Sequence, residues 1–444
     1  MGFQQGLSGL NAASKSLDVI GNNIANASTV GFKQGQTQFA DVYANSLNGS
    51  SAGTVGIGTK VSGVVQQFTQ GNISTTNNPL DIAINGGGFF RMSTNGAVTY
   101  TRNGQFQLDK LGNIVNAQGA QLTGYVANAA GVLSTGAAAP ININTADIPP
   151  AQSTLINAVM NLDSRKLVPG TQLPATIPPV ITPIAFSATD PTTYNSSTSL
   201  AVFDSLGNSH VVQSFFVKRD NILTPPTLPV TIEWDVFATV DGVLIAGAGA
   251  TANSVTRLGF DNLGRLSAVT PQFSATDPRA TTLTVPVSTG AITPINTTLD
   301  IKYDFTGTTQ FGSDFSVSKN TQDGYSSGKL AKFNTAKDGT IVGSYTNGKT
   351  AVLAQVVLAN FTNPNGLQST GDNQWIETAT SGNALVGPPN SGALGTLTSS
   401  ATEDSNTDLT GELVNMITAQ RVYQANAQTI KTQDQVLQTL VNLR

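Results

Sequence analysis

The stretch NNIANASTVGFKQ, residues 22–34, ends a run of about three heptads at the start of the chain. Apolar residues occupy every seventh position in one stripe of that run: Phe3, Leu10, Leu17 and Ile24. A second stripe lies beside the first: Gly6, Ala13, Ile20 and Ala27. Because this period is typical of helices that pack on other helices, the sequence predicts an N-terminal helix of the coiled-coil kind.

The C-terminal end of the chain has the same period. Its first stripe is Leu409, Met416, Tyr423, Ile430 and Leu437. Its second stripe is Leu413, Gln420, Ala427, Asp434 and Val441. Thr407 or Asp408 can cap the helix, and acidic residues near its start lie at the positive end of the helix dipole. The sequence therefore predicts a second coiled-coil-like helix, paired with the first in one layer.

The two helices could instead lie on the surface of a globular domain. Such helices usually have a broader apolar face, so the narrow stripes favour a coiled-coil seam. Gly9 and Gly21 each cost the N-terminal helix about 1 kcal/mol relative to Ala, in a segment short enough to be marginal alone. We therefore expect the helices to need partners, through an assembly interface comprising Phe3, Leu10, Leu17, Ile20, Ile24, Leu409, Leu413, Met416, Tyr423, Ile430, Leu437 and Val441.

Between the two ends the sequence changes to a pattern of short strands. A recurring unit, an apolar residue followed by Asp-x-Leu-Gly-Asn/Arg, occurs as LDKLGN (108–113), FDSLGN (203–208) and FDNLGR (260–265). In this unit Asp bonds the backbone ahead of it and Gly takes the positive-φ position, which closes a hairpin turn with a bulge. Strands are predicted at 97–101, 200–203, 211–217, 231–238, 341–345 and 352–361. The middle of the chain is thus expected to be all-β.

Proline-rich segments suggest domain boundaries, the first of them in TADIPPAQST (145–154). Residues 362–404, rich in Gly, Ser, Thr and Asn, are predicted to form a long irregular connection. The predicted fold is mostly β with terminal α-helices and with nested β domains inserted between them. Its predicted parts are 146–307 as an outer β domain, 72–145 with 308–358 as a first β domain, and 1–71 with 359–444 as the helical core and its connecting segments.

Composition narrows the class of partner. Charged residues are 11% of the 444 and the formal net charge is −4. No nucleic-acid partner is expected, because phosphate binding depends on clustered Lys and Arg. The chain has no cysteine, which excludes disulfides, iron–sulfur clusters and thiolate zinc sites. It also has no apolar run of about 18 residues, so no membrane insertion is expected.

No catalytic, cofactor or metal site is predicted. His210, the only histidine, is interpreted as a solvated strand residue, and a multi-histidine metal site is impossible. NGGGFF (85–90) lacks the spacing and the following helix of a phosphate loop and is interpreted as a tight turn between strands. SSGK (326–329) matches a Ser-x-x-Lys pattern without the companion motifs of acyl-enzymes. The sequence therefore favours a structural protein over an enzyme.

The opening stretch is similar to a signature of bacterial flagellar axial proteins, the family of rod, hook and hook–filament junction proteins. In that signature a helix is followed by Ala-Asn-x-x-Thr-x-Gly-Phe-Lys, which here is Ala25, Asn26, Thr29, Gly31, Phe32 and Lys33. The C-terminal ELVNMITAQRVYQANAQTIKTQDQVLQTLVNLR resembles the terminal helix of the hook members. NPLDIAINGGGFF, DGYSSGKL, DGTIVGSYTNG and VLANFTNPNGL are further matches to hook members.

The resemblance implies a structural subunit of the flagellar hook, which self-assembles into a flexible curved tube and transmits torque as a universal joint. It implies that paired helices line the tube, with the β domains stacked outward. The implied partners are copies of the same chain, a rod protein, a hook–filament junction protein, a hook cap protein and the flagellar type III export apparatus. Export by that route suits a start that has no cleavable signal peptide, and it implies an extracellular location.

Two other interpretations stay open on sequence alone. A distal rod protein of the flagellar basal body shares both ends but is much shorter. A non-flagellar surface adhesin would account for the β domains but not for the heptads at both ends. In the hook interpretation the motif after the first helix is a joint, in which Gly31 allows a change of direction and Phe32 anchors the turn. An ordinary helix C-cap would have the same local sequence.

Overall fold

The computed structural model describes residues 2–42, 56–128, 131–144, 146–170, 184–219, 232–245, 249, 251–272, 277–286 and 298–442. The chain divides into two compact units. The first unit comprises 1–145, 330–344 and 350–444, and the second comprises 146–329 and 345–349. The described part is mostly β with one α-helix at each end, which confirms the predicted fold class.

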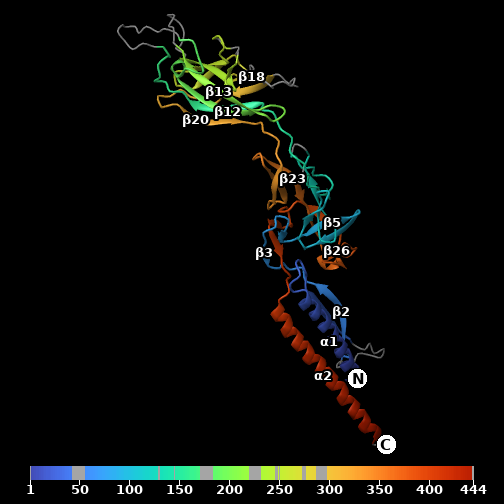
Figure 1. Ribbon diagram of the computed structural model, residues 1–444. Helices are drawn as coiled ribbons and strands as arrows, with labels where there is room; N and C mark the ends of the chain where they lie inside the picture. The colour runs from blue at the N-terminus through green and yellow to red at the C-terminus, as the bar shows by residue number, and fades with distance from the viewer. Residues whose placement is uncertain are drawn as a thin grey trace. The chain divides into compact units, whose positions relative to one another are not determined.

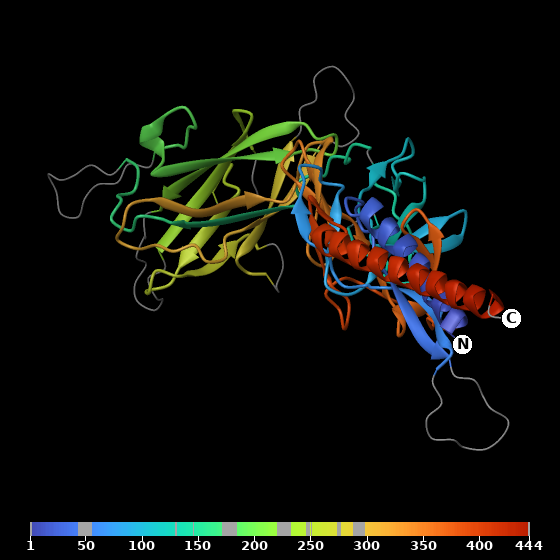
Figure 2. The same ribbon diagram turned by 90° about the horizontal axis from the view of Figure 1, so that it is seen from below.

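The two terminal helices belong to the first unit and are α1 (Gly2–Ala25) and α2 (Leu409–Asn442). They lie side by side and run antiparallel (Figures 1 and 2). At one end of the pair Asn23 donates a 3.3 Å hydrogen bond to Glu412, and at the other Gly6 faces Ile430. Asp408 caps the first turn of α2 with its carboxylate, as predicted.

α2 is the longer helix of the pair. Its 34 residues extend about 51 Å, whereas the 24 residues of α1 extend about 36 Å. After Ile430, α2 continues for about three turns, but α1 has only about one turn before Gly6. The C-terminal part of α2 therefore runs past the start of α1 (Figure 1).

A two-stranded antiparallel ribbon follows α1 and comprises β1 (Gly35–Val42) and β2 (Gly58–Gln66). Asn23 of α1 fixes the start of this ribbon. Its amide nitrogen donates to the Gly35 carbonyl and its amide oxygen accepts from the Gly35 N–H, both at 2.9 Å. Because Asn23 is buried, the asparagine cluster that ends the heptads ties the helix to the ribbon.

The β body of the first unit is one large mixed-order sheet with two short ribbons. The sheet runs in the order β21-β22-β23-β9-β5-β6-β26-β25, and its core includes the fully buried Ile84, Phe90 and Leu122. The strands of the sheet and the two ribbons together are β3 (Ile73–Thr75), β4 (Ile82–Asn85), β5 (Phe89–Thr94), β6 (Ala97–Thr101), β7 (Gln107–Leu108), β8 (Ile114–Val115), β9 (Gln121–Val126), β10 (Ala139–Pro140), β21 (Leu330–Thr335), β22 (Thr340–Tyr345), β23 (Thr350–Val356), β24 (Leu358–Asn360), β25 (Gln368–Gly371), β26 (Gln374–Ile376), β27 (Leu385–Gly387), β28 (Thr396–Ser399) and β29 (Ala401–Glu403). The pairs β3–β29 and β4–β28 join early strands to strands near α2.

The second unit is a sandwich of two sheets. A six-stranded sheet has the order β12-β13-β14-β16-β17, with β15 on β14, and a four-stranded sheet has the order β18-β19-β11-β20. Phe216 and Phe260 of the first sheet share one buried core with Ile301 of the second. The strands are β11 (Leu155–Asn161), β12 (Ser196–Phe203), β13 (Ser209–Lys218), β14 (Ile232–Val240), β15 (Val243–Leu244), β16 (Thr256–Phe260), β17 (Leu266–Thr270), β18 (Ala280–Pro286), β19 (Thr298–Asp304) and β20 (Ser316–Gln322).

Most of the predicted strands are confirmed. Each predicted stretch coincides with a strand, although 352–361 is divided at Val357 into β23 and β24, and residue 231 lies outside the described residues. The three Asp-x-Leu-Gly units all close hairpins, between β7 and β8, β12 and β13, and β16 and β17. NGGGFF forms the predicted tight turn between β4 and β5. The three-part division of the chain stays a prediction.

Two predictions are wrong. Residues 362–404 contain β25 to β29, because short ladder pairings order a segment whose composition indicated a loop. His210 is not solvated: it is buried, and its Nδ1 lies 2.8 Å from a carboxylate oxygen of Asp241. Its Nε2 lies 3.7 Å from Asp204, the aspartate of the neighbouring hairpin turn. The ring is buried because its place on the strand lies next to two turns. The alternation of apolar and polar residues along the strand does not reveal this.

Candidate assembly interface and joint

α2 exposes apolar side chains along its whole length. None of its described side chains is buried. Lone apolar residues on a surface are ordinary, but nine on a single helix form a surface that water solvates poorly. These nine are Leu409, Leu413, Val414, Ile417, Val422, Tyr423, Val436, Leu437 and Val441.

α1 turns its two predicted stripes in different directions. Gly6, Ala13 and Ile20 of the second stripe are buried. The first stripe, with the larger side chains, is less covered, and Phe3 at its start is 47% exposed. Close packing of the helix pair therefore uses small residues of α1 and leaves large ones available. At Gly6, for example, even a methyl group would lie only 3.0 Å from Ile430.

The predicted interface residues all lie on the helix pair, and their side chains differ in how far they are exposed. Six are exposed: Phe3, Leu409, Leu413, Tyr423, Leu437 and Val441. Five are half-buried: Leu10, Leu17, Ile24, Met416 and Ile430. Ile20 alone of the twelve is buried. Their role in assembly stays a prediction.

A groove of about 700 Å³ runs between α1, α2 and β1. Its floor includes small residues of α1, among them Gly9, Ala12 and Ala13. Phe39 of β1 and Val422 of α2 also line it, and both are exposed. The groove therefore combines small residues that permit close approach with large apolar side chains that have little cover.

The family motif begins where α1 ends. Ala25 is the last helical residue and is exposed. The Asn26 side chain bonds back to the carbonyl of Asn22 at 3.0 Å and accepts a 3.2 Å hydrogen bond from the Thr29 hydroxyl. These contacts tie the segment that follows α1 to the last turn of the helix.

Gly31 and Phe32 make the turn after the helix. Gly31 has φ +72°, and a Cβ at this position would lie 2.5 Å from the backbone nitrogen of Asn103. Only glycine fits, for both conformational and steric reasons. The Gly31 N–H donates to the Glu403 carbonyl at 2.8 Å, and Phe32 is buried beside it in sequence. The local geometry therefore agrees with a change of direction at Gly31.

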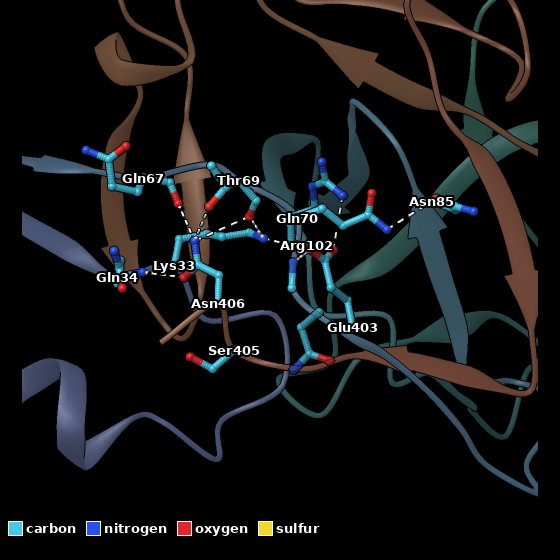
Figure 3. Close-up of polar contacts among 12 residues, drawn as sticks. Lys33, Gln34, Gln67, Thr69, Gln70, Asn85, Arg102, Glu403, Ser405 and Asn406 are labelled. Carbon is cyan, nitrogen blue, oxygen red and sulfur yellow. Dashed lines mark hydrogen bonds and ion pairs between the residues drawn. The ribbon is translucent and has the colours of Figure 1, made fainter. Parts of the chain in front are cut away.

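Lys33 ends the motif in a buried ionic cluster (Figure 3). Its Nζ lies 2.7 Å from Oε1 of Glu403 and donates to the Thr69 carbonyl at 2.8 Å. The guanidinium of Arg102 donates to the other oxygen of Glu403 at 3.0 Å and to the Gly86 carbonyl at 2.8 Å. One carboxylate from the segment before α2 thus holds a residue that follows α1 and a residue that follows β6.

Because this cluster is buried, its charges need each other as partners. The side chains of Lys33, Arg102 and Glu403 are at most 4% exposed. Burial lowers the pKa of Lys33 and of Arg102, and the charge of Glu403 opposes that effect on both. The Arg102 guanidinium also lies 5.5 Å from the ring centre of Phe89. Because two cations share one anion, loss of Glu403 would leave two buried charges without a partner.

The amide side chain of Asn406 makes further contacts beside the cluster. Asn406, two residues before Asp408, accepts from the Gln34 N–H at 2.8 Å and donates to the Gln67 carbonyl at 2.7 Å. Figure 3 shows that these bonds link the segments after α1, after β2 and before α2. The start of α2 is thereby fixed to the segment that leaves α1 and to the end of the ribbon.

The sequence did not identify Arg102 and Glu403 as functional residues. Arg102 begins the stretch RNGQ (102–105), whose Asn-Gly pair indicates a turn, and Glu403 lies in a polar segment, 370 residues from Lys33. An isolated charged residue has no periodic signal, so pairing over such a separation cannot be read from one chain. The arrangement suits a mechanical role. Among the residues that the structure describes, no three His, Cys, Asp or Glu side chains gather to hold a metal, and no helix could span a membrane.

Four family models match separate segments of the chain. Residues 3–33 match the flagella basal body rod protein model, and 398–443 match the C-terminal model of the flagellar basal body rod FlgEFG proteins. Residues 83–159 match the flagellar hook protein FlgE/F/G D1 domain. Residues 161–325 match the flagellar basal body protein FlaE D2 domain.

Relatives and a solved structure agree with these models. The chain is 42% identical to flagellar hook protein FlgE of Escherichia coli and 44% identical to that of Salmonella typhimurium, each over the full length of both chains. It is 32% identical to FlgE of Borreliella burgdorferi over 99% of this chain and 98% of that one. The crystal structure of Helicobacter pylori flagellar hook protein FlgE2 has a similar fold, with a TM-score of 0.53 at 14% identity, over 73% of this chain and 98% of that one.

Proposed function

This chain belongs to the flagellar hook protein family, and from that premise we propose that its copies join through the helix pair into a curved tube that acts as a universal joint. It is a structural subunit of the hook, a component of the basal body that lies outside the membrane, and it is not an enzyme. The helix pair lines the tube, and the β domains lie outside it. The twelve predicted residues of α1 and α2 form the contact between copies.

The observation that carries this proposal is the incomplete burial of the helix pair. Exposed apolar area contributes about 25 cal/mol per Å² when a partner covers it, so a helix with nine exposed apolar residues gains stability mainly from assembly. α2 also runs past α1, which offers its last turns to another copy. The groove between α1, α2 and β1 supplies a complementary surface on that copy, because its floor has small residues.

The joint supports torque transmission. Gly31 redirects the chain, Phe32 anchors the turn, and the ionic cluster of Lys33, Arg102 and Glu403 fixes both helices to the β body. A load applied to the helices is therefore carried by buried charged hydrogen bonds in the β body. The three sequence-predicted parts of the chain are, on this proposal, the inner layer, the first β layer and the outer layer of the tube.

Bending requires the outer surfaces of neighbouring copies to slide. The chain is poor in charge, with 11% charged residues against about a quarter in an average protein. Strong ion pairs between copies would resist sliding, whereas polar uncharged contacts exchange readily with water. We propose that this composition serves the cyclic change in subunit spacing as a bent tube rotates.

The remaining partners follow from position in the flagellum. A rod protein below, a hook–filament junction protein above and a hook cap protein during growth would contact the ends of the tube. The flagellar type III apparatus would export the chain without cleavage of a signal peptide. The described helices, which need a partner to be fully covered, suit a chain that reaches its final order only at the growing end.

One substitution separates assembly from folding. Leu437→Asp places a charge in the exposed stripe of α2, and we expect it to abolish polymer in a sedimentation assay. The melting of the β body should not change, because Leu437 is 55% exposed and lies far along α2 from the joint. Gln435→Asp is the matched control, since position 435 faces about 200° away on the same helix. Normal tubes from Leu437→Asp would contradict the proposal.

The state of the isolated subunit gives a second test. If partners order the helices, dilute monomer should show protease-sensitive termini and less helix by circular dichroism than the assembled protein. A strictly monomeric sample with protected termini would instead favour an adhesin-like protein whose helices dock on its own body.

A further inference from the structure

The three Asp-x-Leu-Gly turns have one common geometry. In each, the aspartate N–H donates to the carbonyl of the residue four positions later, and the glycine N–H donates to the aspartate carbonyl. The aspartate side chain accepts from the leucine N–H at 2.8 to 2.9 Å. The glycines have φ between +73° and +85°. The leucines at the tips are Leu111, Leu206 and Leu263.

The turn itself does not require leucine. Residues 116–120 form the same hydrogen bonds with Asn116 in the aspartate position and Gln118 at the tip. Residues 336–340 and 345–349 form the same backbone pairing with Asp338 and Asn347 at the tip. Polar tips are thus compatible with this geometry at three places in the chain. The leucines of the other three turns need a separate explanation.

The leucines contribute little to the fold of their own units. Leu111 is 78% exposed, Leu206 is 58% exposed and Leu263 is 63% exposed. Burial of a leucine stabilises a fold in proportion to the apolar area covered, and here most of that area is not covered within the subunit. An exposed leucine recurs at the same position of three hairpins. A single exposed leucine would be ordinary on any protein surface.

Two of these turns lie at opposite ends of one sheet in the second unit. The β12–β13 turn lies at the end of β14 marked by Val240, which pairs with Val212 near the start of β13. The β16–β17 turn lies at the other end, where Ile232 of β14 pairs with Phe260. The nine residues of β14 separate these ends by about 27 Å.

Each end carries further exposed apolar residues near its leucine turn. At the Leu206 end, Val211 and Val243 are 50% and 65% exposed. At the Leu263 end, Phe311 is 48% exposed and its ring lies close to Gly264 of the turn. The second unit therefore presents two apolar patches on opposite ends of the same sheet. An open helical polymer needs this arrangement, because each copy offers one surface to the neighbour on one side and a different surface to the neighbour on the other.

We propose that Leu111, Leu206 and Leu263 are contact points between β domains of neighbouring copies of this chain. The inference rests on the proposed polymer and adds a second set of contacts outside the helix pair. An apolar tip has no directional bonds, so it keeps contact area while neighbouring surfaces shift. The three leucines hold the outer layers together, and the uncharged surface around them permits movement.

The experiment compares polymers of full-length variants. Leu206→Asn with Leu263→Asn in one chain should raise the protein concentration needed for tube formation by at least about tenfold, which corresponds to about 1.4 kcal/mol per subunit. Leu385→Asn removes an equally exposed leucine (64%) that lies on strand β27 rather than in such a turn, and it should assemble like the wild type. Calorimetry of the monomers should show unchanged unfolding in both variants.

The outcomes separate this inference from the proposed function. If wild type assembles, Leu437→Asp does not, and the double asparagine variant assembles at the wild-type concentration, the leucine contacts are refuted while the polymer stands. If wild type fails to polymerise under all conditions, both fall. A double variant with altered monomer unfolding is replaced by a labelled-cysteine measurement, for which the cysteine-free chain is suited.

That measurement uses an environment-sensitive fluorophore on Leu206→Cys, with Gln118→Cys as the matched control at the same turn position. On assembly, the label at 206 should shift to shorter wavelength as the tip becomes covered, and the label at 118 should shift much less. Equal spectra at both positions before and after assembly would overturn the proposal.

Discussion

The helix pair and the β-sandwich of the second unit treat apolar side chains in opposite ways. β14 buries every residue from Trp234 to Val240, including both faces of the strand. α2 buries none of its described side chains along 34 residues. The core of the sandwich is closed within one subunit, and segment 184–195 also covers part of the outer face of its larger sheet, where Phe186 stacks on Phe237 at 4.2 Å.

This difference indicates where the two regions obtain their stability. The sandwich is stabilised by close packing in a core that belongs to a single chain. Within the subunit, the two helices pack only on each other and on the β1–β2 ribbon, so much of their stability depends on other copies. The joint combines both properties, since its own side chains are buried but it fixes two helices that are only partly buried.

The largest expected effect on monomer stability is in the sandwich. Phe260→Ala removes a fully buried side chain and should lower the free energy of unfolding of the second unit by about 4 kcal/mol. The same change at Phe3 of α1 should cost less than about 1 kcal/mol, because that ring is half exposed in the monomer. Chemical denaturation of both variants tests the contrast. Equal losses would contradict the difference between the regions.

The next largest effect is at the joint. Glu403→Gln keeps the shape of the side chain but leaves Lys33 and Arg102 buried without an anion, so we expect the first unit to lose about 3 kcal/mol. Calorimetry should show a lower transition for the first unit and an unchanged one for the second. Glu412→Gln is the control, because its side chain is half-buried and glutamine can still accept the bond from Asn23. A stability loss below about 1 kcal/mol at position 403 would argue against an ionic joint.

A smaller effect is expected at the turn. Gly31→Ala combines an unfavourable positive φ with a contact of 2.5 Å to backbone, and we expect a loss of about 2 kcal/mol. Gly21→Ala is the matched control, since a Cβ at that position would meet no atom within 4 Å apart from the neighbouring residues and the backbone of its own helix, and alanine favours helix. The control should therefore stabilise slightly. If Gly31→Ala also stabilised, the redirecting role of this glycine would be refuted.

The smallest effect on the monomer is on the exposed stripe. Ile430→Asp lies where α2 meets α1, and Leu437→Asp lies beyond that contact. We expect Leu437→Asp to change monomer stability by less than about 0.5 kcal/mol and Ile430→Asp by somewhat more, while both prevent tube formation. Sedimentation and calorimetry on the same samples check whether a variant with nearly unchanged monomer stability has lost tube formation.

Elements with a strong local period were the most predictable from sequence. The seven-residue steps through Leu10 and Met416 predicted both helices, and each Asp-x-Leu-Gly unit predicted its hairpin, since these signals depend on residues close together in the chain. The direction of packing was less predictable. The large residues of the first α1 stripe stay accessible because Gly6 and Ala13 allow α2 to approach closely, and a count of hydrophobic residues gives such small ones little weight.

Longer-range relations could not be predicted. Glu403 pairs with Lys33 across most of the chain, and β26, β28 and β29 gain their order from partners far away in sequence. Local composition has no information on either. His210 was misinterpreted for the same reason, because Asp241, which bonds it, belongs to a different hairpin.

The separation of Lys33 from Glu403 has a consequence for the order of events during synthesis. Because the chain is synthesised from its N-terminus, Lys33 and Arg102 are present long before Glu403 is added. The cluster can close only after nearly the whole polypeptide has emerged. A subunit truncated before residue 403 would lack the carboxylate that Lys33 and Arg102 share, so the joint can form only in a chain that extends at least to Glu403.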